Sequence, residues 1–261
     1  MRYALTAASF LVLAGCSHST PAPSSSPTSQ SQEAPVSMQS LVEAPDRTDA
    51  DRALDAGRHP AALLEFAGVR PGMKVAELMA GTGYTTEFLV RAVGPTGKVY
   101  GENPKVVLER FAEKRWQERL ARPVNQGVVR VDRELDSPVP PEVNDLDVVV
   151  SNIIYHDTTW LGVDRAKMNA AVFQALKPGG VYVVLDSSAK SGTGLADTET
   201  LHRIDEKVVR DEVQAAGFKF QEESNVWRNP EDTRDWNSSP GAAGERRGTS
   251  DRFALKFVKP G

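Results

Sequence analysis

Two glycines near an acidic side chain form the first pattern in this sequence that could bind a small molecule. Residues 77–83 read Glu-Leu-Met-Ala-Gly-Thr-Gly, and Gly81 and Gly83 lack the Cβ that would keep a ligand away from the backbone. The loop follows a short apolar run, which predicts a strand that ends there. Glu102 lies about 20 residues further on, the spacing expected of an acid that binds ribose hydroxyls. The pattern predicts a nucleotide-type ligand, with a tight turn that binds nothing as the alternative.

A neighbouring histidine and aspartate form the second pattern. His156 and Asp157 follow the mostly apolar run at 146–154, with Tyr155 between. A free imidazole titrates at about pH 6.5, so it can accept a hydroxyl proton near neutrality. We therefore predict that His156 is a general base with Asp157 beside it. The alternative is that His156 is a loop residue that hydrogen-bonds the backbone.

Metal and disulfide chemistry are not predicted. The four histidines are scattered along the chain without metal-ligand spacing, and Cys16 is the only cysteine. Around His202 we expect ordinary structural roles: Asp205 caps a helix, Arg203 is a surface charge, and His202 takes no part in proton transfer. The alternative is that this segment contacts the substrate.

Apolar runs alternate with amphipathic segments through most of the chain. We expect strands at 74–78, 98–101, 127–131, 146–154, 181–185, 218–225 and 252–259, and helices at 85–93, 106–120, 165–176 and 204–213. Strands separated by helices predict a doubly wound α/β fold with right-handed crossovers. The last two strands have no helix between them. We therefore predict a mostly parallel, seven-stranded Rossmann-like sheet with an antiparallel edge strand.

The glycine loop, Glu102 and the Leu-Lys-Pro-Gly-Gly segment at 176–180 together resemble the class I S-adenosylmethionine-dependent methyltransferases over residues 68–261. The resemblance implies S-adenosylmethionine as the cofactor. It further implies that Glu77, Ala80, Gly81 and Gly83 line the methionine end of the cofactor and that Glu102 binds its ribose.

The sequence departs from the family pattern at one position and leaves the adenine contact undecided. The family usually has a further glycine where this chain has Met79. An acid near the end of the third strand commonly contacts adenine in the family, and Asp132, Glu134 and Asp136 are three alternatives for that contact.

The segment around His156 is similar to the His-Asp-x-Trp stretch of small-molecule O-methyltransferases, in which the histidine removes the hydroxyl proton. Here Trp160 stands one place later than in that pattern. The likeness implies methyl transfer to an oxygen of a small-molecule acceptor, with His156 and Asp157 as the catalytic residues.

The N-terminus has the features of an export signal. Arg2 precedes a mostly apolar run at 4–14, and residues 13–16 read Leu-Ala-Gly-Cys, which resembles a bacterial lipobox. We expect a lipoprotein signal peptide at 1–15, a lipidated Cys16 that begins a Ser- and Pro-rich tether at 16–40, and a methyltransferase-like domain at 41–261. An ordinary signal peptide with an accidental cysteine is the alternative. The expected location is the bacterial cell envelope, on either membrane.

Charge excludes one class of partner. The chain has 31 basic and 35 acidic residues, so it lacks the basic excess that holds nucleic acid. We predict a methyltransferase held to a membrane through Cys16. Because S-adenosylmethionine is made in the cytoplasm and is charged, an exported enzyme lacks an evident supply of it. The alternatives are a non-catalytic envelope lipoprotein that binds another small ligand in the same cleft, and a membrane-surface adaptor without a ligand.

Overall fold

The computed structural model describes residues 37–261. The expected signal peptide and Cys16 lie outside the described residues. The first helix, α1 (Met38–Val42), begins inside the segment expected to be tether, with Ser37 as its N-cap. No helix within 37–261 is long and apolar enough to cross a membrane.

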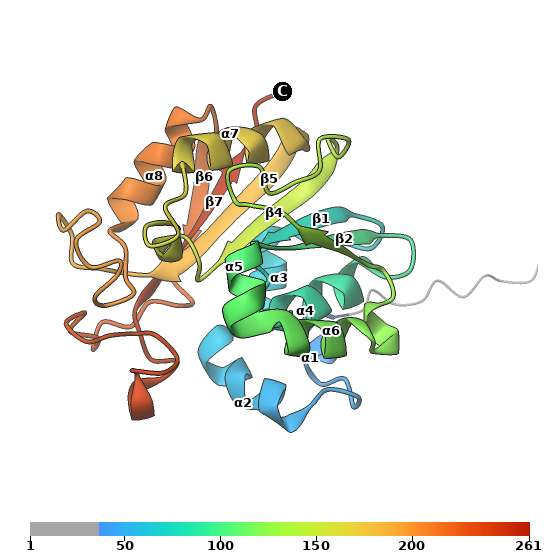
Figure 1. Cartoon of the computed structure of the whole chain (residues 1–261), viewed down its shortest axis with the longest axis horizontal. Helices are drawn as coiled ribbons and strands as arrows, with labels where there is room; N and C mark the ends of the chain where they lie inside the picture. Colours follow the sequence, from blue (N-terminus) through green and yellow to red (C-terminus); the bar gives the residue numbers. More distant parts are fainter. Residues whose placement is uncertain (1–36) are drawn as a thin grey trace, which may run out of the picture. The chain divides into compact units, whose positions relative to one another are not determined.

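A seven-stranded sheet forms the centre of the domain (Figure 1). Its strands are β1 (Lys74–Leu78), β2 (Lys98–Asn103), β3 (Val128–Asp132), β4 (Leu146–Asn152), β5 (Leu176–Ser187), β6 (Lys219–Ser224) and β7 (Arg252–Val258). They lie in the order β3-β2-β1-β4-β5-β7-β6. All neighbours from β3 to β5 pair in parallel, whereas β7 is antiparallel to both β5 and β6. The predicted fold class is confirmed, and the antiparallel strand lies one place in from the edge.

Helices cover both faces of the sheet. α3 (Pro60–Ala67) and α4 (Tyr84–Val93) pack on one face, and α7 (Arg165–Ala175) and α8 (Glu206–Ala215) pack on the other (Figure 1). α2 (Asp49–Arg58) precedes α3. The helix predicted at 106–120 is divided into α5 (Lys105–Val107), a π-helical turn (Leu108–Ala112) and α6 (Glu113–Leu120).

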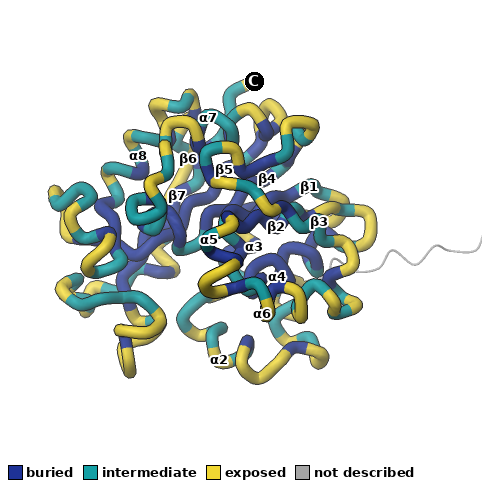
Figure 2. Tube along the Cα trace, in the orientation of Figure 1, coloured by how far each residue is buried: buried dark blue, intermediate teal, exposed yellow. Residues whose placement is uncertain are grey.

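The core lies between the sheet and its two helical layers, and Figure 2 shows the central strands as buried. In β4, Val148, Val149 and Val150 are each at most 2% exposed, because both faces of a central parallel strand are covered. This double burial explains why the middle of β4 is the apolar run Val148–Val150.

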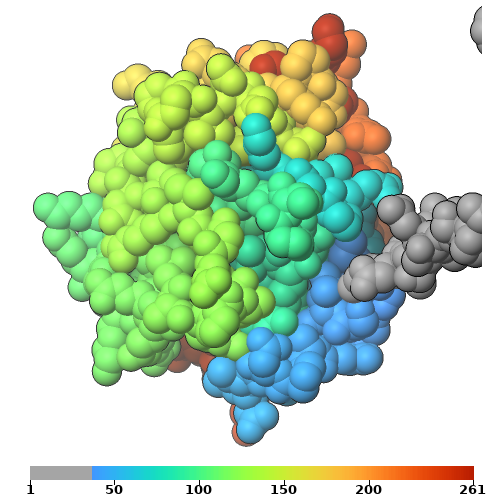
Figure 3. Space-filling model, turned by 90° about the vertical axis from the view of Figure 1, so that its right-hand side faces the viewer, coloured from blue at the N-terminus to red at the C-terminus, as the bar shows by residue number. Residues whose placement is uncertain are grey.

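The strand order reverses between β1 and β4, which makes their carboxyl ends the place where ligands bind in open α/β sheets. The glycine loop follows β1 and the His156 segment follows β4, so topology brings the two predicted patterns to one edge. The N-terminal segment, blue in Figure 3, lies against the α4 and α6 region, and Asp46 pairs there with Arg91. This ion pair joins the start of the described chain to the last turn of α4.

Candidate functional site

The loop after β1 is fixed by the end of β2. The Met79 N–H donates to Glu102 Oε2 at 2.8 Å, and the Ala80 N–H donates to the Glu102 carbonyl at 2.7 Å. Asn103 Oδ1 accepts from the Gly81 N–H at 2.7 Å, and its Nδ2 donates to the Gly81 carbonyl at 3.1 Å. These bonds hold the loop in one conformation before any ligand arrives.

One carboxylate oxygen of Glu102 accepts no hydrogen bond within the described residues. The residue is 1% exposed, and Oε1 has no hydrogen-bond partner among the described residues. Burial raises the pKa of this carboxyl well above its ordinary value. A buried acceptor without a donor is costly, and a ligand hydroxyl would satisfy it. The carboxyl group therefore fits the ribose role that the resemblance implies.

The two glycines of the loop have different surroundings. Gly81 has φ +59°, and a Cβ there would meet nothing nearer than 4.0 Å, so its side is open. At Gly83 a Cβ would lie 2.3 Å from the Trp116 ring, so packing alone requires a glycine there. Met79, at the position where the family usually has glycine, has φ +47°. The loop thus keeps a conformation that favours glycine while carrying a methionine.

Glu77 is a buried carboxyl at the end of β1. It accepts a hydrogen bond from Thr86 Oγ1 in the first turn of α4 and is 4% exposed. Burial raises the pKa of Glu77 to about 7, although Thr86 and the positive charge of Arg58 act in the opposite direction. A cationic group, such as the ammonium group of a methionine moiety, would favour its ionised form.

The structure separates the three acids considered for adenine. Asp136 Oδ1 accepts from the Asp164 N–H at 3.0 Å, which occupies it ahead of α7. Asp132 and Glu134 lie close enough to Glu102 for their charges to raise its pKa. Asp132 ends β3 opposite Asn103 and pairs with Arg130. Asp132 and Glu134 therefore lie near the ribose candidate, whereas Asp136 is hydrogen-bonded to the residue that caps α7.

The carboxylate of Asp186, a residue not predicted from the sequence to belong to the site, accepts two hydrogen bonds from His156. The His156 backbone N–H donates to Asp186 Oδ2 at 2.8 Å, and its Nδ1 donates to Asp186 Oδ1 at 2.7 Å. Asp186 lies in β5 and is fully buried. Ile153, with φ +61°, turns the chain out of β4 just before this segment. The position of Asp186, directly after the predicted fifth strand, was the sequence signal that could have identified it.

The Asp186 contact changes the titration expected of His156. Burial lowers the pKa of the imidazole, but the charge of Asp186 and its hydrogen bond outweigh burial and raise the pKa to about 9. The near-neutral value expected from the sequence is therefore wrong, because that expectation did not include a buried carboxylate at Nδ1.

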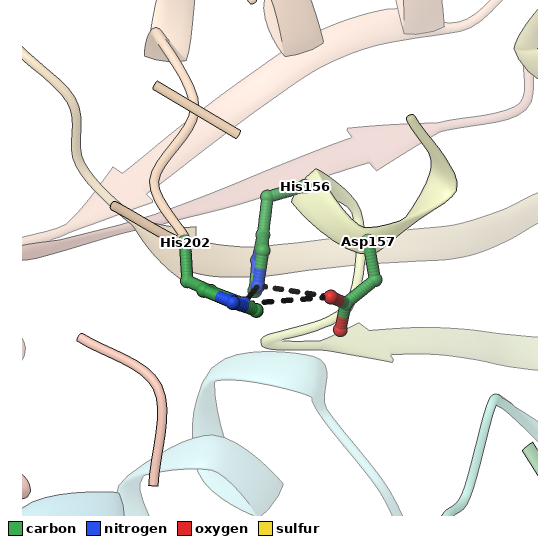
Figure 4. Close-up of side chains that lie close together, drawn as sticks. All are labelled: His156, Asp157 and His202. Carbon is green, nitrogen blue, oxygen red and sulfur yellow. Dashed lines mark hydrogen bonds and ion pairs between the residues drawn. The ribbon is translucent and has the colours of Figure 1, made fainter. Parts of the chain in front are cut away.

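The side chains of Asp157 and His202 meet the imidazole ring of His156 (Figure 4). Nε2 of His156 lies 3.4 Å from Asp157 Oδ1 and 3.3 Å from His202 Nδ1, and His202 Nδ1 lies 3.7 Å from Asp157 Oδ1. Trp160 Nε1 donates to Asp157 Oδ1 at 2.7 Å, so the displaced tryptophan still reaches the aspartate. His202, expected to stand apart from this chemistry, contacts His156 directly. Sequence spacing gave no sign of this, since the two histidines come from separate loops.

Of the two residues near His202, Asp205 has the role predicted for it and Arg203 does not. Asp205 caps α8 by accepting from the Lys207 N–H at 3.0 Å, as predicted. Arg203 is not a surface charge: it is 0% exposed and pairs with the equally buried Asp232 at 2.8 Å. The buried pair anchors the loop that presents His202.

Two guanidinium groups lie near the same edge without a carboxylate partner within the described part of the chain. Arg252 begins β7 beside Ser187, and Arg58 ends α2 over the Tyr84 ring. Burial and the charge of Arg58 lower the pKa of Arg252 to about 10, and burial lowers that of Arg58. Both guanidinium groups can donate hydrogen bonds to an anionic group of a ligand.

The chain is similar in sequence to known methyltransferases. No family model matches the chain. The ubiquinone/menaquinone biosynthesis C-methyltransferase UbiE of Burkholderia multivorans is 29% identical over 189 residues, which cover 69% of this chain and 72% of that protein.

Solved structures share the fold. An S-adenosylmethionine-dependent methyltransferase from Aquifex aeolicus superposes with a TM-score of 0.57 at 15% identity, over 85% of this chain and 97% of that one. Aeropyrum pernix fibrillarin with natively bound S-adenosyl-L-methionine gives 0.51 at 13% identity, over 78% and 76%.

The sheet order, the glycine loop and the curated relatives define an S-adenosylmethionine-dependent methyltransferase. The chain belongs to the class I superfamily of these enzymes, and its cofactor is the S-adenosylmethionine of that class. The unpaired Glu102 oxygen and the open side of Gly81 fit this cofactor.

Proposed function

We propose that this enzyme methylates a hydroxyl oxygen of a small-molecule acceptor, and that lipid on Cys16 holds it at the bacterial cell envelope. The observation that carries the reaction is the position of His156. Asp186 holds its Nδ1, so Nε2 is the ring atom directed to the cluster at the edge of the sheet. When bound, S-adenosylmethionine supplies a methyl group that already carries a good leaving group. The enzyme therefore needs alignment and a group that removes the hydroxyl proton.

The residues of this chain divide the work between cofactor and acceptor. Glu77, Ala80, Gly81 and Gly83 would hold the methionine end, and Glu102 would bind the ribose hydroxyls through Oε1. The neutral form of His156, which a pKa of about 9 makes dominant only above that pH, would accept the proton at Nε2, and Asp157 would stabilise the charge that results. Arg58 and Arg252 would hold a carboxylate or another acidic group of a ligand.

Carbon is the competing target, because the relative from Burkholderia multivorans is named a C-methyltransferase. The position of His156 favours oxygen, since an imidazole held by a buried carboxylate is suited to ionising a hydroxyl. Mass spectrometry of products made with isotopically labelled methyl donor distinguishes the two, because an O-methyl group and a C-methyl group fragment differently.

Binding is measured before turnover. Calorimetry of the purified full chain with S-adenosylmethionine and its demethylated product tests the cofactor site, and no binding at millimolar ligand would contradict it. Incubation with hydroxyl-bearing small molecules then tests the reaction. Formation of an O-methyl product supports oxygen transfer, whereas a C-methyl product as the only methylated species contradicts it.

A further inference from the structure

We propose that His156, His202 and Asp157 form a binding site for a divalent transition metal, with Zn²⁺ as the ion that their geometry fits best. The three ligand atoms are His156 Nε2, His202 Nδ1 and Asp157 Oδ1, which all lie within 4.8 Å of one another. Figure 4 shows both imidazole rings directed toward the carboxylate. Metal binding does not depend on the proposed reaction, because it rests on the positions of these side chains alone.

The spacing of the three atoms is that of a tetrahedral site. Ligand atoms at roughly 2.05 Å from a tetrahedral Zn²⁺ lie about 3.3 Å apart. The three separations here are 3.3, 3.4 and 3.7 Å. Small rotations of the side chains would bring all three atoms to the metal distance without moving the backbone.

The donor set selects the class of ion. Two imidazole nitrogens and one carboxylate suit Zn²⁺ and other divalent transition metals, whereas Mg²⁺ and Ca²⁺ prefer oxygen ligands. Three protein ligands leave a fourth position for water or for a ligand oxygen, as in catalytic zinc sites. The His202 and Asp157 side chains are 29% and 18% exposed, so an ion can reach them.

The partners behind the ligands match those that orient metal-binding residues elsewhere. A ligating histidine usually donates its other ring nitrogen to a carboxylate, and His156 does so to Asp186 at 2.7 Å. Trp160 Nε1 fixes the Asp157 carboxylate at 2.7 Å. Hydrogen bonds of this kind hold a metal-binding side chain in the orientation that the ion requires.

The backbone of His202 is held in an uncommon conformation at this point. His202 has φ +51°, and Ser238 Oγ donates to its carbonyl at 2.7 Å. The buried Arg203–Asp232 pair fixes the next residue. A non-glycine residue kept at positive φ by several contacts is typical of functional sites, and here it directs Nδ1 toward His156.

Metal and proton compete for one lone pair, that of His156 Nε2. With Zn²⁺ bound, His156 is a ligand, and a hydroxyl at the fourth position loses its proton more readily because of the metal. Without Zn²⁺, His156 itself accepts the proton, as in the proposed function. Failure of metal binding would therefore leave the proposed function standing.

The test uses the full chain without a histidine tag, treated with a chelator and then titrated with Zn²⁺ in a calorimeter. We expect one equivalent at the cluster. His202→Ala should raise the Kd for Zn²⁺ by more than about 100-fold, and Asp186→Asn by about 10- to 100-fold, as is usual for an outer-shell partner. His202→Cys supplies a replacement ligand and should retain tight binding. His59→Ala changes a histidine outside the cluster and should bind as the parent does.

The visible spectrum of bound Co²⁺ tests the coordination geometry of the site independently of the zinc titration. A tetrahedral site gives Co²⁺ an intense visible absorption, which should be present in the parent and His202→Cys and absent in His202→Ala. Equal zinc affinity in the parent and a folded His202→Ala variant would overturn the proposal, as would the absence of binding to the parent at micromolar free Zn²⁺. Circular dichroism of each variant confirms that it is folded.

Discussion

Nδ1 of His156 lies 2.7 Å from Oδ1 of Asp186, and both residues are buried. A carboxylate oxygen accepts here, so Nδ1 carries a hydrogen, and Nε2 becomes available to a proton, an acceptor or a metal once it has lost its own proton, which a pKa of about 9 makes the rule only above that pH. This pair joins the chain after β4 to the end of β5, which explains how a residue in a short loop acquires a fixed orientation.

His156→Ala is expected to lower turnover by roughly 10²- to 10⁴-fold while leaving the affinity for S-adenosylmethionine nearly unchanged, because the ring acts on the acceptor. Asp186→Asn should also lower turnover, since an amide can donate to Nδ1 and reverse the tautomer. Steady-state kinetics and calorimetry on the same preparations measure both quantities.

The control for these variants is His59→Ala. His202→Ala is unsuitable, because His202 contacts His156 at 3.3 Å. A loss of cofactor binding that accounts for the whole loss of turnover in His156→Ala would show that the histidine serves the cofactor site. The zinc titration, and not this prediction, separates a proton acceptor from a metal ligand.

Glu102→Ala is expected to weaken binding of S-adenosylmethionine by about 10- to 150-fold, which corresponds to roughly 1.5–3 kcal/mol for the hydrogen bonds that the ribose would lose in a buried site. Part of that loss would come from releasing the Met79 N–H. Glu102→Gln keeps an acceptor oxygen and should lose less. Equal affinity in the parent and both variants would place the cofactor elsewhere.

A glycine comparison tests the open side of the loop. Gly81→Ala should reduce cofactor affinity, because its Cβ would enter the space beside the loop. Gly68→Ala is the matched control: Gly68 has φ +70° and open space around it, but it ends α3. Both changes add similar backbone strain, roughly 1–2 kcal/mol, so thermal unfolding should shift alike. If Gly68→Ala weakened cofactor binding as much, strain alone would explain the effect of Gly81→Ala.

Cys16→Ser tests the anchor, which lies outside the described residues. Without the thiol no lipid can be attached, so the protein should move from the detergent-extracted membrane fraction to the soluble or uncleaved fraction. Fractionation followed by mass spectrometry of the N-terminal peptide measures this. Mature Cys16→Ser protein that stays in the membrane fraction would disprove lipid attachment at this residue.

The sequence predicted the fold well because buried parallel strands such as β4 must be apolar, and their spacing along the chain determines the topology. It placed Glu102 at a strand end for a related reason, since strand ends are visible as changes from apolar to polar residues. It could not place His202 beside His156, or bury Arg203 against Asp232, because those contacts join loops whose paths depend on tertiary packing. The backbone conformation of Met79 was also not predicted: its φ is positive, as favoured by the glycine that the family usually has at this position.

The last prediction concerns Glu77, whose pKa is raised to about 7 mainly by burial, from an ordinary value of 4.5. Between those two pH values the folded state binds more protons than the unfolded state, so the contribution of Glu77 to the free energy of unfolding falls as pH rises. The shift corresponds to about 3 kcal/mol, all of it lost above about pH 7. Glu77→Gln carries no titrating group, so its stability relative to the parent should rise across this range and then level off. Urea unfolding of both proteins at several pH values measures the difference, with the exposed Glu65→Gln as control. A difference independent of pH would show that Glu77 is ionised throughout.

S-adenosylmethionine should lower the raised pKa of Glu77, because its ammonium group favours the ionised carboxyl. Binding near pH 6 should therefore release a proton, which calorimetry in two buffers detects.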